Sequence, residues 1–278
     1  MKSKIAVLLT CFNRREKTLA CLSSLFNSSL LLDSTLDVFL VDDGSTDGTS
    51  QTVKEKYPNV IIIQGNGNLY WNHGMRLAWE TAAKTKKYDY YLWLNDDTIL
   101  NSNALIELLE CSNEAFKKDN KPVIITGACR ESLNENKFTY GGRTETGPVI
   151  PNGSLQECLY INGNVVLIPY ELYHKLGNLS PNYSHAIGDL DYGLRAKEAG
   201  FKCYTSRSYI ALCSTNCQPE WSNPDIPLKN RLKILYSIKG LNLMEYLRFI
   251  KKYRGLYYMI NLLFKIYFRV LFPRTYIK

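Results

Sequence analysis

The chain has no run of about 20 uninterrupted apolar residues, so no transmembrane span is predicted. Its first apolar stretch, residues 5–9, is too short for the core of a secretory signal, and no cleavage-site pattern follows it. The eight cysteines include no Cys-x-x-Cys pair, and several lie in apolar segments, as small buried residues do. From these absences we expect a cytoplasmic protein with reduced thiols.

Acidic residues are scarce near the C-terminal end. Residues 225–278 hold twelve Lys or Arg but two Asp or Glu, a local charge of +10 (12 − 2). Because the whole chain has 34 basic and 26 acidic side chains, residues 1–224 carry 22 and 24, a balance of −2. We therefore expect a folded domain over 1–224 and a basic tail over 225–278. The tail lacks a nucleic-acid recognition motif, so nucleic acid is not an expected partner.

Apolar segments alternate with segments of helical spacing through the first half of the chain. The predicted strands cover 4–10, 36–41, 60–63, 88–94 and 123–126, and the predicted helices cover 15–27, 49–56, 72–84 and 101–118. This order predicts a Rossmann-like α/β fold, a mostly parallel sheet with helices on both faces.

Later segments are less regular. Residues 131–157 suggest a hairpin or a long functional loop. Short helices are predicted over 170–176 and 189–199, and a further strand over 202–205. No Gly-x-Gly-x-x-Gly follows the first strand, so a dinucleotide-binding dehydrogenase is disfavoured.

Two adjacent carboxylates, Asp96 and Asp97, follow the apolar strand that ends at Leu94. Ligands of open α/β sheets bind beyond the carboxyl ends of the strands, so a divalent cation bridging to a phosphate would offset the repulsion between these carboxylates. The alternative is that one of them caps the helix starting near Asn101. Further acidic clusters stand at Asp42-Asp43 and at Asp189-Leu190-Asp191.

Four stretches in order, residues 7–14, 41–49, 94–97 and 188–195, resemble family 2 glycosyltransferases of the GT-A fold. The resemblance extends to bacterial enzymes of cell-surface polysaccharides, including rhamnosyltransferase-like members, and covers about residues 3–215. It implies a nucleotide-binding half over about 1–126 and an acceptor-binding half over about 127–224. It further implies transfer of a sugar from a UDP- or dTDP-linked donor to a hydroxyl of a glycan or lipid-linked acceptor.

The resemblance places the nucleotide at the ends of the first strands. Phe12 can pack on the base, Thr10 can hydrogen-bond it, and Asp43 would accept the N3–H of uracil or thymine. Ordinary loop packing and turn formation are the alternatives for these three residues. The remaining expected nucleotide contacts are Arg14, Asn72, Arg76 and Asp96, the last one at the ribose or as a support of the metal site.

The expected cofactor is Mg²⁺ or Mn²⁺, bound by Asp97, which matches the last carboxylate of the family's Asp-x-Asp motif. Here the first position of that motif is Asn95. Some family members add a histidine after the last core strand, where this chain has Cys213 in the run Leu-Cys-Ser.

The expected catalytic base is Asp189, in a motif that usually reads Glu-Asp but here has Gly188. It would take the proton of the acceptor hydroxyl as this oxygen attacks the anomeric carbon opposite the diphosphate, which inverts the configuration. Asp191 is the alternative base, or caps the helix or binds the acceptor. Arg195 is expected to form a salt bridge that fixes the loop or to contact phosphate.

Three further residues are candidates for sugar contacts. Asn162 and Asn164 lie in the stretch that lines the sugar cleft in the family, and Trp221 can stack on a sugar face. A hydrophobic anchor is the alternative role of Trp221.

The tail over 228–278 is helical in pattern and carries eleven aromatic residues. Its wide apolar face and cationic polar face suit a peripheral position on the inner face of the cell membrane. The alternatives are a lid on the catalytic domain or a homodimer contact. For the whole protein, the alternatives to an active glycosyltransferase are a non-catalytic GT-A domain that binds nucleotide or glycan and a sugar nucleotidyltransferase.

Overall fold

The computed structural model describes residues 3–31, 34–133, 135–215 and 219–276. The chain divides into two units, the first comprising Met1–Pro181 and Gly188–Thr215 and the second Asn182–Ile187 and Asn216–Lys278. The division at residue 215 precedes the expected domain boundary at 224. The short segment 182–187 belongs to the second unit, although it lies between two parts of the first.

The described residues of the first unit contain a ten-stranded sheet in the order β3-β2-β1-β4-β9-β6-β10-β5, with β7 paired to β6 and β8 paired to β10. Neighbours among β1 to β4 are parallel, as are β6 and β10, whereas β9 is antiparallel to β4 and to β6. The strands are β1 (Lys4–Cys11), β2 (Thr35–Asp42), β3 (Ile61–Gln64), β4 (Tyr90–Leu94), β5 (Ile99–Leu100), β6 (Ile124–Ser132), β7 (Glu135–Phe138), β8 (Gln156–Cys158), β9 (Val165–Pro169) and β10 (Cys203–Leu212).

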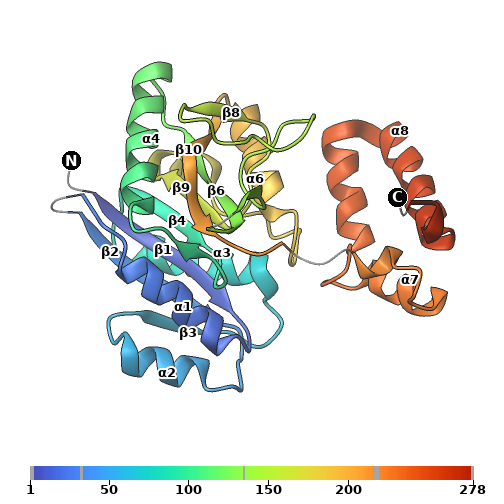
Figure 1. The fold of residues 1–278 in the computed structure, drawn as a ribbon, viewed down its shortest axis with the longest axis horizontal. Helices are drawn as coiled ribbons and strands as arrows, with labels where there is room; N and C mark the ends of the chain where they lie inside the picture. Colours follow the sequence, from blue (N-terminus) through green and yellow to red (C-terminus); the bar gives the residue numbers. More distant parts are fainter. Residues whose placement is uncertain (1–2, 32–33, 134, 216–218, 277–278) are drawn as a thin grey trace. The chain divides into compact units, whose positions relative to one another are not determined.

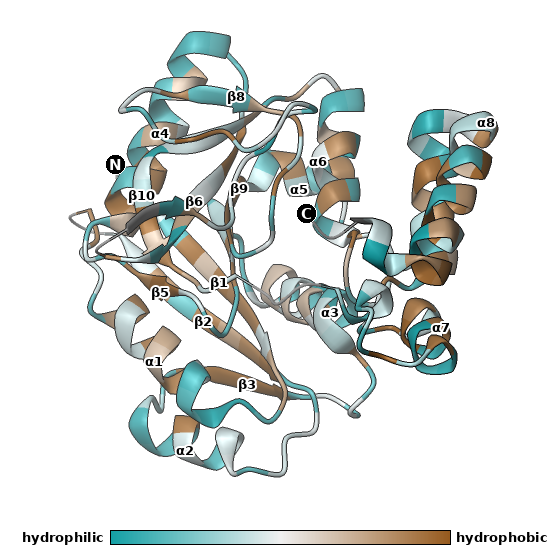
Figure 2. Ribbon diagram, turned by 45° about the vertical axis from the view of Figure 1, so that its right-hand side comes forward, coloured by the Kyte–Doolittle hydropathy of each residue, from teal (hydrophilic) through white to brown (hydrophobic). Residues whose placement is uncertain are grey.

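Helices cover both faces of this sheet, as predicted (Figure 1). The central strands are buried on both sides and are therefore almost continuously apolar, the brown ribbons of Figure 2. In β1, Val7 and Leu9 pack toward α1, α2 and α4, whereas Ala6 and Leu8 pack toward α3, α5 and α6. The helices are α1 (Arg15–Phe26), α2 (Thr49–Lys56), α3 (Tyr70–Thr85), α4 (Ala104–Asp119), α5 (Tyr170–Leu176) and α6 (Gly188–Glu198).

Several strand and helix boundaries differ from the sequence expectations, among them the end of the strand predicted over 123–126, which continues to Ser132 as β6. The strand predicted over 202–205 continues to Leu212 as β10. The helix predicted from 101 starts at Ala104 as α4, after the two-residue strand β5. The segment 131–157 contributes the β6–β7 hairpin and β8, which confirms the predicted hairpin.

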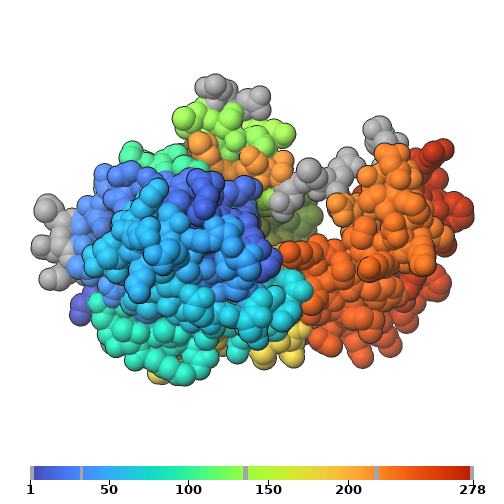
Figure 3. Space-filling model, turned by 90° about the horizontal axis from the view of Figure 1, so that it is seen from below, coloured from blue at the N-terminus to red at the C-terminus, as the bar shows by residue number. Residues whose placement is uncertain are grey.

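The N-terminal segments, blue to cyan, form one continuous surface (Figure 3).

The second unit contains the predicted helical extension, α7 (Leu228–Tyr236) and α8 (Leu243–Leu271), with short 3₁₀ turns at Glu220–Ser222 and Pro273–Tyr276. Helix α8 is interrupted at Gly255, whose φ of 84° only glycine adopts readily. Among the described residues no helix is long and apolar enough to cross a membrane.

Candidate active site

The two aspartates that follow β4 are held by one arginine from the loop after β1. Nη1 of Arg14 lies 3.2 Å from Oδ1 of Asp96, and Nη2 lies 2.5 Å from Oδ2 of Asp97. Burial raises the pKa of Asp96 to about 7, with Arg14 opposing this shift and the neighbouring Asp97 adding to it. The second oxygen of Asp96, Oδ2, is buried and has no hydrogen-bond partner in the described part of the chain.

Neither aspartate caps the following helix, so the capping alternative is wrong. Helix α4 begins at Ala104 after the cap residue Asn103, and no side chain there bonds the first turn. Strand β5 separates α4 from the acidic pair. The pair therefore has no role in local helix formation.

Cys213 occupies the place beside Asp97 where some family members have a histidine. Its Sγ lies 3.8 Å from Oδ1 of Asp97 and 3.1 Å from Nδ2 of Asn164. Burial raises the pKa of Cys213 to about 12, with Asp97 adding to the shift, so the group is a thiol at neutral pH. No cluster of three or more His, Cys, Asp or Glu suited to a metal occurs within the described ranges.

Asn164 bonds both flanks of the acidic pair. Its buried amide nitrogen lies 3.3 Å from Oγ1 of Thr98, and its carbonyl accepts the N–H of Asn95 at 2.9 Å. Asn162 accepts the N–H of Asn164 at 3.2 Å and so shapes the turn before β9. The sugar contacts expected of Asn162 and Asn164 stay predictions.

Asp43, at the end of β2, fixes the loop that leads into α3. Its carboxylate accepts the backbone N–H groups of Gly67, Leu69 and Tyr70 at 2.9, 2.9 and 3.0 Å. The turn-forming role belongs to Asp47, whose Oδ1 accepts the N–H of Thr49 at 3.1 Å. Asp43 thus holds a preformed loop beside the end of β1.

Phe12 and Thr10, which we expected to contact the nucleotide base, have different surroundings. Phe12, on the loop after β1, is 40% exposed. Thr10, the next-to-last residue of β1, touches α3, because a Cβ added at Gly74 would overlap its Oγ1. Helix α3 therefore packs unusually close to the end of β1.

Asn72 and Arg76, which we expected to contact the nucleotide, bond backbone carbonyls of residues 179 and 180, shortly before the segment 182–187. The amide of fully buried Asn72 donates to the Ser180 carbonyl at 2.8 Å, and the guanidinium of Arg76 donates to the Leu179 carbonyl. The nucleotide contact expected of each residue stays a prediction. The side chains lie on α3 as predicted, but they face a neighbouring segment of protein.

The two aspartates of α6 differ sharply. Half-buried Asp189 accepts the backbone N–H groups of Gly163 and Leu190, each at 2.8 Å, and burial raises its pKa while these hydrogen bonds oppose the shift. Asp191 is fully buried and paired at 2.9 Å with Arg195, whose guanidinium also donates to two carbonyls of the 176–178 segment. This pairing is the expected salt bridge of Arg195.

Trp71 connects the two acidic motifs, a feature that the sequence analysis missed. Its indole N–H donates to Oδ1 of Asn95 at 2.7 Å. Its ring fills the space that a Cβ at Gly163 would take, and the N–H of Gly163 bonds Asp189. Two sequence features could have indicated this connection. Trp71 is an aromatic residue in a stretch of polar residues, and Gly163 stands between two asparagines.

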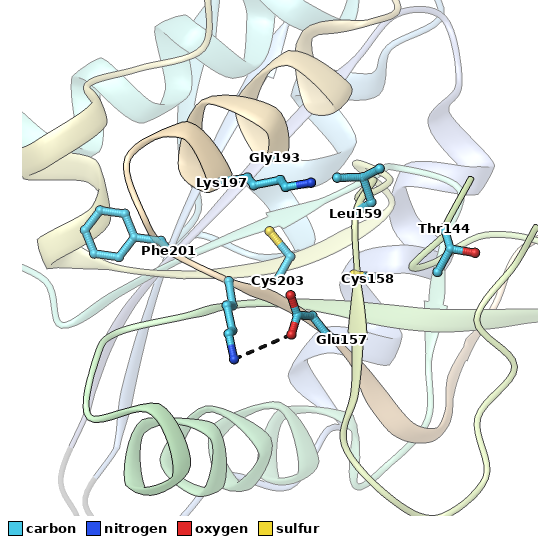
Figure 4. A pocket seen from close by; sticks show the side chains of 9 residues that line it. Thr144, Glu157, Cys158, Leu159, Gly193, Lys197, Phe201 and Cys203 are labelled. Carbon is cyan, nitrogen blue, oxygen red and sulfur yellow. Dashed lines mark ion pairs between the residues drawn. The ribbon is translucent and has the colours of Figure 1, made fainter. Parts of the chain in front are cut away.

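A pocket of about 260 Å³ lies elsewhere in the first unit, between β8, β10 and α6 (Figure 4). An ion pair of 3.5 Å between Lys202 and Glu157 stands at its edge. None of the expected site residues lines this pocket, whose walls are formed by Thr144, Glu157, Cys158, Leu159, Gly193, Lys197, Phe201, Lys202 and Cys203.

Trp221 is a core residue of the second unit. It is 9% exposed, packs with Leu235, Leu243 and Val270, and has the Arg269 guanidinium 5.2 Å from its ring centre. These contacts support the alternative of a hydrophobic anchor over sugar stacking.

The order of this sheet and the acidic residues after β2 and β4 and at the start of α6 agree with the GT-A fold that the resemblance implies. The sequence profile of Glycosyl transferase family 2 matches residues 6–167, which is 162 (167 − 6 + 1) of the 278 residues. The chain belongs to this family and is a glycosyltransferase.

Curated relatives match over part of their length. The chain is 28% identical over 127 residues to a poly(ribitol-phosphate) beta-glucosyltransferase of Bacillus spizizenii, covering 45% of this chain and 19% of that protein. It is 31% identical over 156 residues to a poly-beta-1,6-N-acetyl-D-glucosamine synthase of Staphylococcus aureus, covering 56% and 34%. The match thus spans at most about a third of these relatives.

Two solved structures share the fold. A mannosyltransferase from Pyrobaculum calidifontis in complex with GDP-Man and Mn²⁺ has a TM-score of 0.56 at 14% identity, covering 99% of this chain and 83% of that chain. TarS of S. aureus in complex with UDP has a TM-score of 0.55 at 16% identity, covering 86% and 71%. These likenesses confirm the predicted GT-A fold.

Position 188 accepts only glycine for a steric reason, because a Cβ there would overlap the amide of Asn72. We expect Gly188→Ala to lower the free energy of unfolding by about 1–3 kcal/mol, a typical cost of overpacking. Adding Asn72→Ala removes the overlap, so the double variant should be more stable than the sum of both single effects predicts. Urea unfolding of the four proteins measures this coupling.

The matched control is Gly193→Ala in the same helix, where the added Cβ would meet Cγ1 of Ile161 at 3.2 Å. It should cost less than Gly188→Ala, since an isoleucine side chain can shift and alanine favours the helix. Strictly additive effects of the substitutions at 188 and 72 would contradict the direct overlap.

Proposed function

We propose that this glycosyltransferase transfers a sugar, with inversion, from a UDP- or dTDP-linked donor to a hydroxyl of a glycan or lipid-linked acceptor. The observation that carries the proposal is the link from the acidic pair to Asp189. Asn95, next to the pair, bonds Trp71, and Trp71 packs on the glycine whose N–H holds Asp189. This series of contacts therefore fixes the positions of the acidic pair and Asp189 relative to each other.

Asp97 and Asp96 are the proposed holders of a divalent cation, Mg²⁺ or Mn²⁺. The fit rests on the buried oxygen of Asp96 without a partner among the described residues and on the carboxylate of Asp97, which is 24% exposed. Carboxylate oxygens are the ligands that these ions prefer. The bound ion would neutralise charge on the departing nucleoside diphosphate.

The nucleotide is proposed to lie over the ends of β1 and β2. Phe12 offers an exposed ring to the base, and Thr10 lies at the same strand end. A carboxylate has about four acceptor positions, and Asp43 uses three of them on backbone N–H groups, so one position is left for the N3–H of a pyrimidine. Arg14 supplies the positive charge that a diphosphate requires.

Asp189 is the proposed general base. The two backbone N–H groups fix its carboxylate in one orientation, and its raised pKa makes it a stronger proton acceptor than an ordinary aspartate. It would take the acceptor's proton as the hydroxyl oxygen bonds to the anomeric carbon and the bond to the diphosphate breaks. Asp191 supports the loop through Arg195.

The test compares Asp189→Asn with Asp191→Asn. Asparagine at 189 keeps the size but cannot accept the proton, so transfer should fall by about 10²–10⁴-fold while UDP binding is unchanged. Asparagine at 191 removes the buried partner of Arg195 and should lower the melting temperature instead. Transfer is measured with UDP- and dTDP-sugars and candidate acceptors, with and without EDTA, and binding by calorimetry.

Retained transfer in Asp189→Asn would move the base to another residue. No turnover by the wild type on any donor, together with intact UDP binding, would instead favour a non-catalytic GT-A domain.

The pH dependence follows from the ionisation of Asp189. Only the ionised carboxylate accepts a proton, so kcat should fall as the pH decreases through its pKa. Because burial raises this pKa above the ordinary 3.8, the acidic limb should lie at higher pH than for an ordinary aspartate. Measuring kcat at saturating donor and cation removes the separate effect of protonating Asp96, and a limb at or below 3.8 would contradict the assignment.

We further propose that α8 holds the enzyme at an anionic membrane surface on the cytoplasmic side. Its second half and Phe272, the residue just past its end, present large and exposed apolar side chains three or four residues apart, namely Tyr257, Ile260, Phe264, Phe268 and Phe272. Such spacing puts them along one side of a helix, and α8 is rich in Lys and Arg. This membrane stripe, the five residues just named, suits a lipid-linked acceptor.

Phe264→Ser with Phe268→Ser in the full chain tests the membrane stripe. Losing two aromatic side chains should weaken binding to phosphatidylserine-containing vesicles by at least about tenfold. The matched control is Phe116→Ser, since that phenylalanine of α4 is 50% exposed and lies outside the stripe. Co-sedimentation measures vesicle binding. Unchanged binding with a shift from dimer to monomer would assign the stripe to a homodimer contact.

A further inference from the structure

Arg14 places its positive charge between Asp96 and Asp97, where a divalent cation would also have to lie. Its two terminal nitrogens contact one oxygen of each carboxylate, at 3.2 and 2.5 Å. Oδ2 of Asp96 has no hydrogen-bond partner among the described residues, but a cation bound there would repel a guanidinium held on the other oxygen of the same carboxylate. The side chain of Arg14 is 37% exposed, so it has a path out of the pair.

Hydrogen bonds hold the backbone on both sides of Arg14. The N–H of Asn13 donates to Ser45 at 2.8 Å, and the side-chain oxygen of Asn13 accepts the N–H of Thr46 at 2.7 Å. On the other side, the N–H of Arg15 donates to Asp47 at 2.9 Å. Both flanks are thus tied to the 45–47 loop, and a rotation of the Arg14 side chain is the available change.

We propose that Arg14 is an internal counter-ion that couples binding of the cation to binding of the diphosphate. In the free protein it competes with the cation for the acidic pair. When a diphosphate is present, the guanidinium moves onto the phosphate oxygens, which match its fork as well as carboxylates do. The inference rests on the proposed function, because it requires a cation and a nucleoside diphosphate at this site.

Charge balance gives the coupling its direction. Two ionised carboxylates and one guanidinium leave an excess of negative charge, whereas adding a divalent cation leaves an excess of positive charge. A diphosphate removes that excess and gives Arg14 a new partner. By linkage, the cation must then strengthen diphosphate binding by the same factor as the diphosphate strengthens cation binding.

The experiment measures Mn²⁺ binding directly, from the electron paramagnetic resonance signal of the free ion, with and without UDP in mildly alkaline buffer. The wild type should bind Mn²⁺ weakly alone and about 5–150-fold more tightly with UDP, the usual range of such coupling. Arg14→Ala should bind Mn²⁺ about tenfold more tightly than the wild type without UDP and should lose most of the coupling. Arg14→Gln gives the same comparison with less loss of side-chain volume.

Arg15→Ala is the matched control. It removes the same charge from the adjacent position, but the Arg15 guanidinium contacts Glu16 at 3.0 Å and the Asp47 carbonyl at 3.1 Å, not the acidic pair. It should leave both Mn²⁺ affinity and coupling unchanged. Asp97→Asn should weaken Mn²⁺ binding under both conditions.

The outcomes separate the inference from the function on which it rests. If the wild type binds Mn²⁺ and UDP but Arg14→Ala and Arg14→Gln behave like Arg15→Ala, the inference is overturned and the proposed function stands. If the wild type binds no Mn²⁺ even with UDP, the proposed cation site fails and the inference fails with it.

Discussion

The site depends on keeping two adjacent carboxylates together at the end of a buried strand. Ionised, they repel each other, and Asp96 loses its hydration through burial. Arg14 offsets this cost from a loop that is itself bonded to the loop after β2. The ends of β1, β2 and β4 are therefore joined by charge and hydrogen bonds, and the parallel sheet brings these ends to the same edge.

Hydrogen bonds from backbone groups position the remaining polar residues. Asp43 and Asp189 each accept backbone N–H groups, so both carboxylates are oriented before any substrate arrives. Such preorganisation avoids the cost of ordering the groups during the reaction. Trp71 adds a rigid spacer, since an aromatic ring resists bending, and its N–H ties it to Asn95. Packing of the apolar core thus extends into the site.

The sequence was sufficient to predict the alternation of strands and helices and the acidic motifs at their ends, because hydrophobic period and turn chemistry are local properties. It was insufficient to tell which way a polar side chain faces. Asn72 and Arg76 sit on α3 as predicted, yet they bond the 179–180 carbonyls, a segment about a hundred positions away. Asn164 likewise supports the acidic pair. Such pairings arise from tertiary contacts that no local pattern encodes.

Gly188 and Asn72 are far apart in the sequence but in contact, so a substitution at one position affects what the other can hold. A chain that gained a side chain at 188 would have to replace the asparagine on α3, and that change would release the Ser180 carbonyl. A substitution at 188 alone crowds the contact, and a substitution at 72 alone loses the hydrogen bond to Ser180. The residue that precedes Asp189 in α6 is thus constrained by a residue of α3.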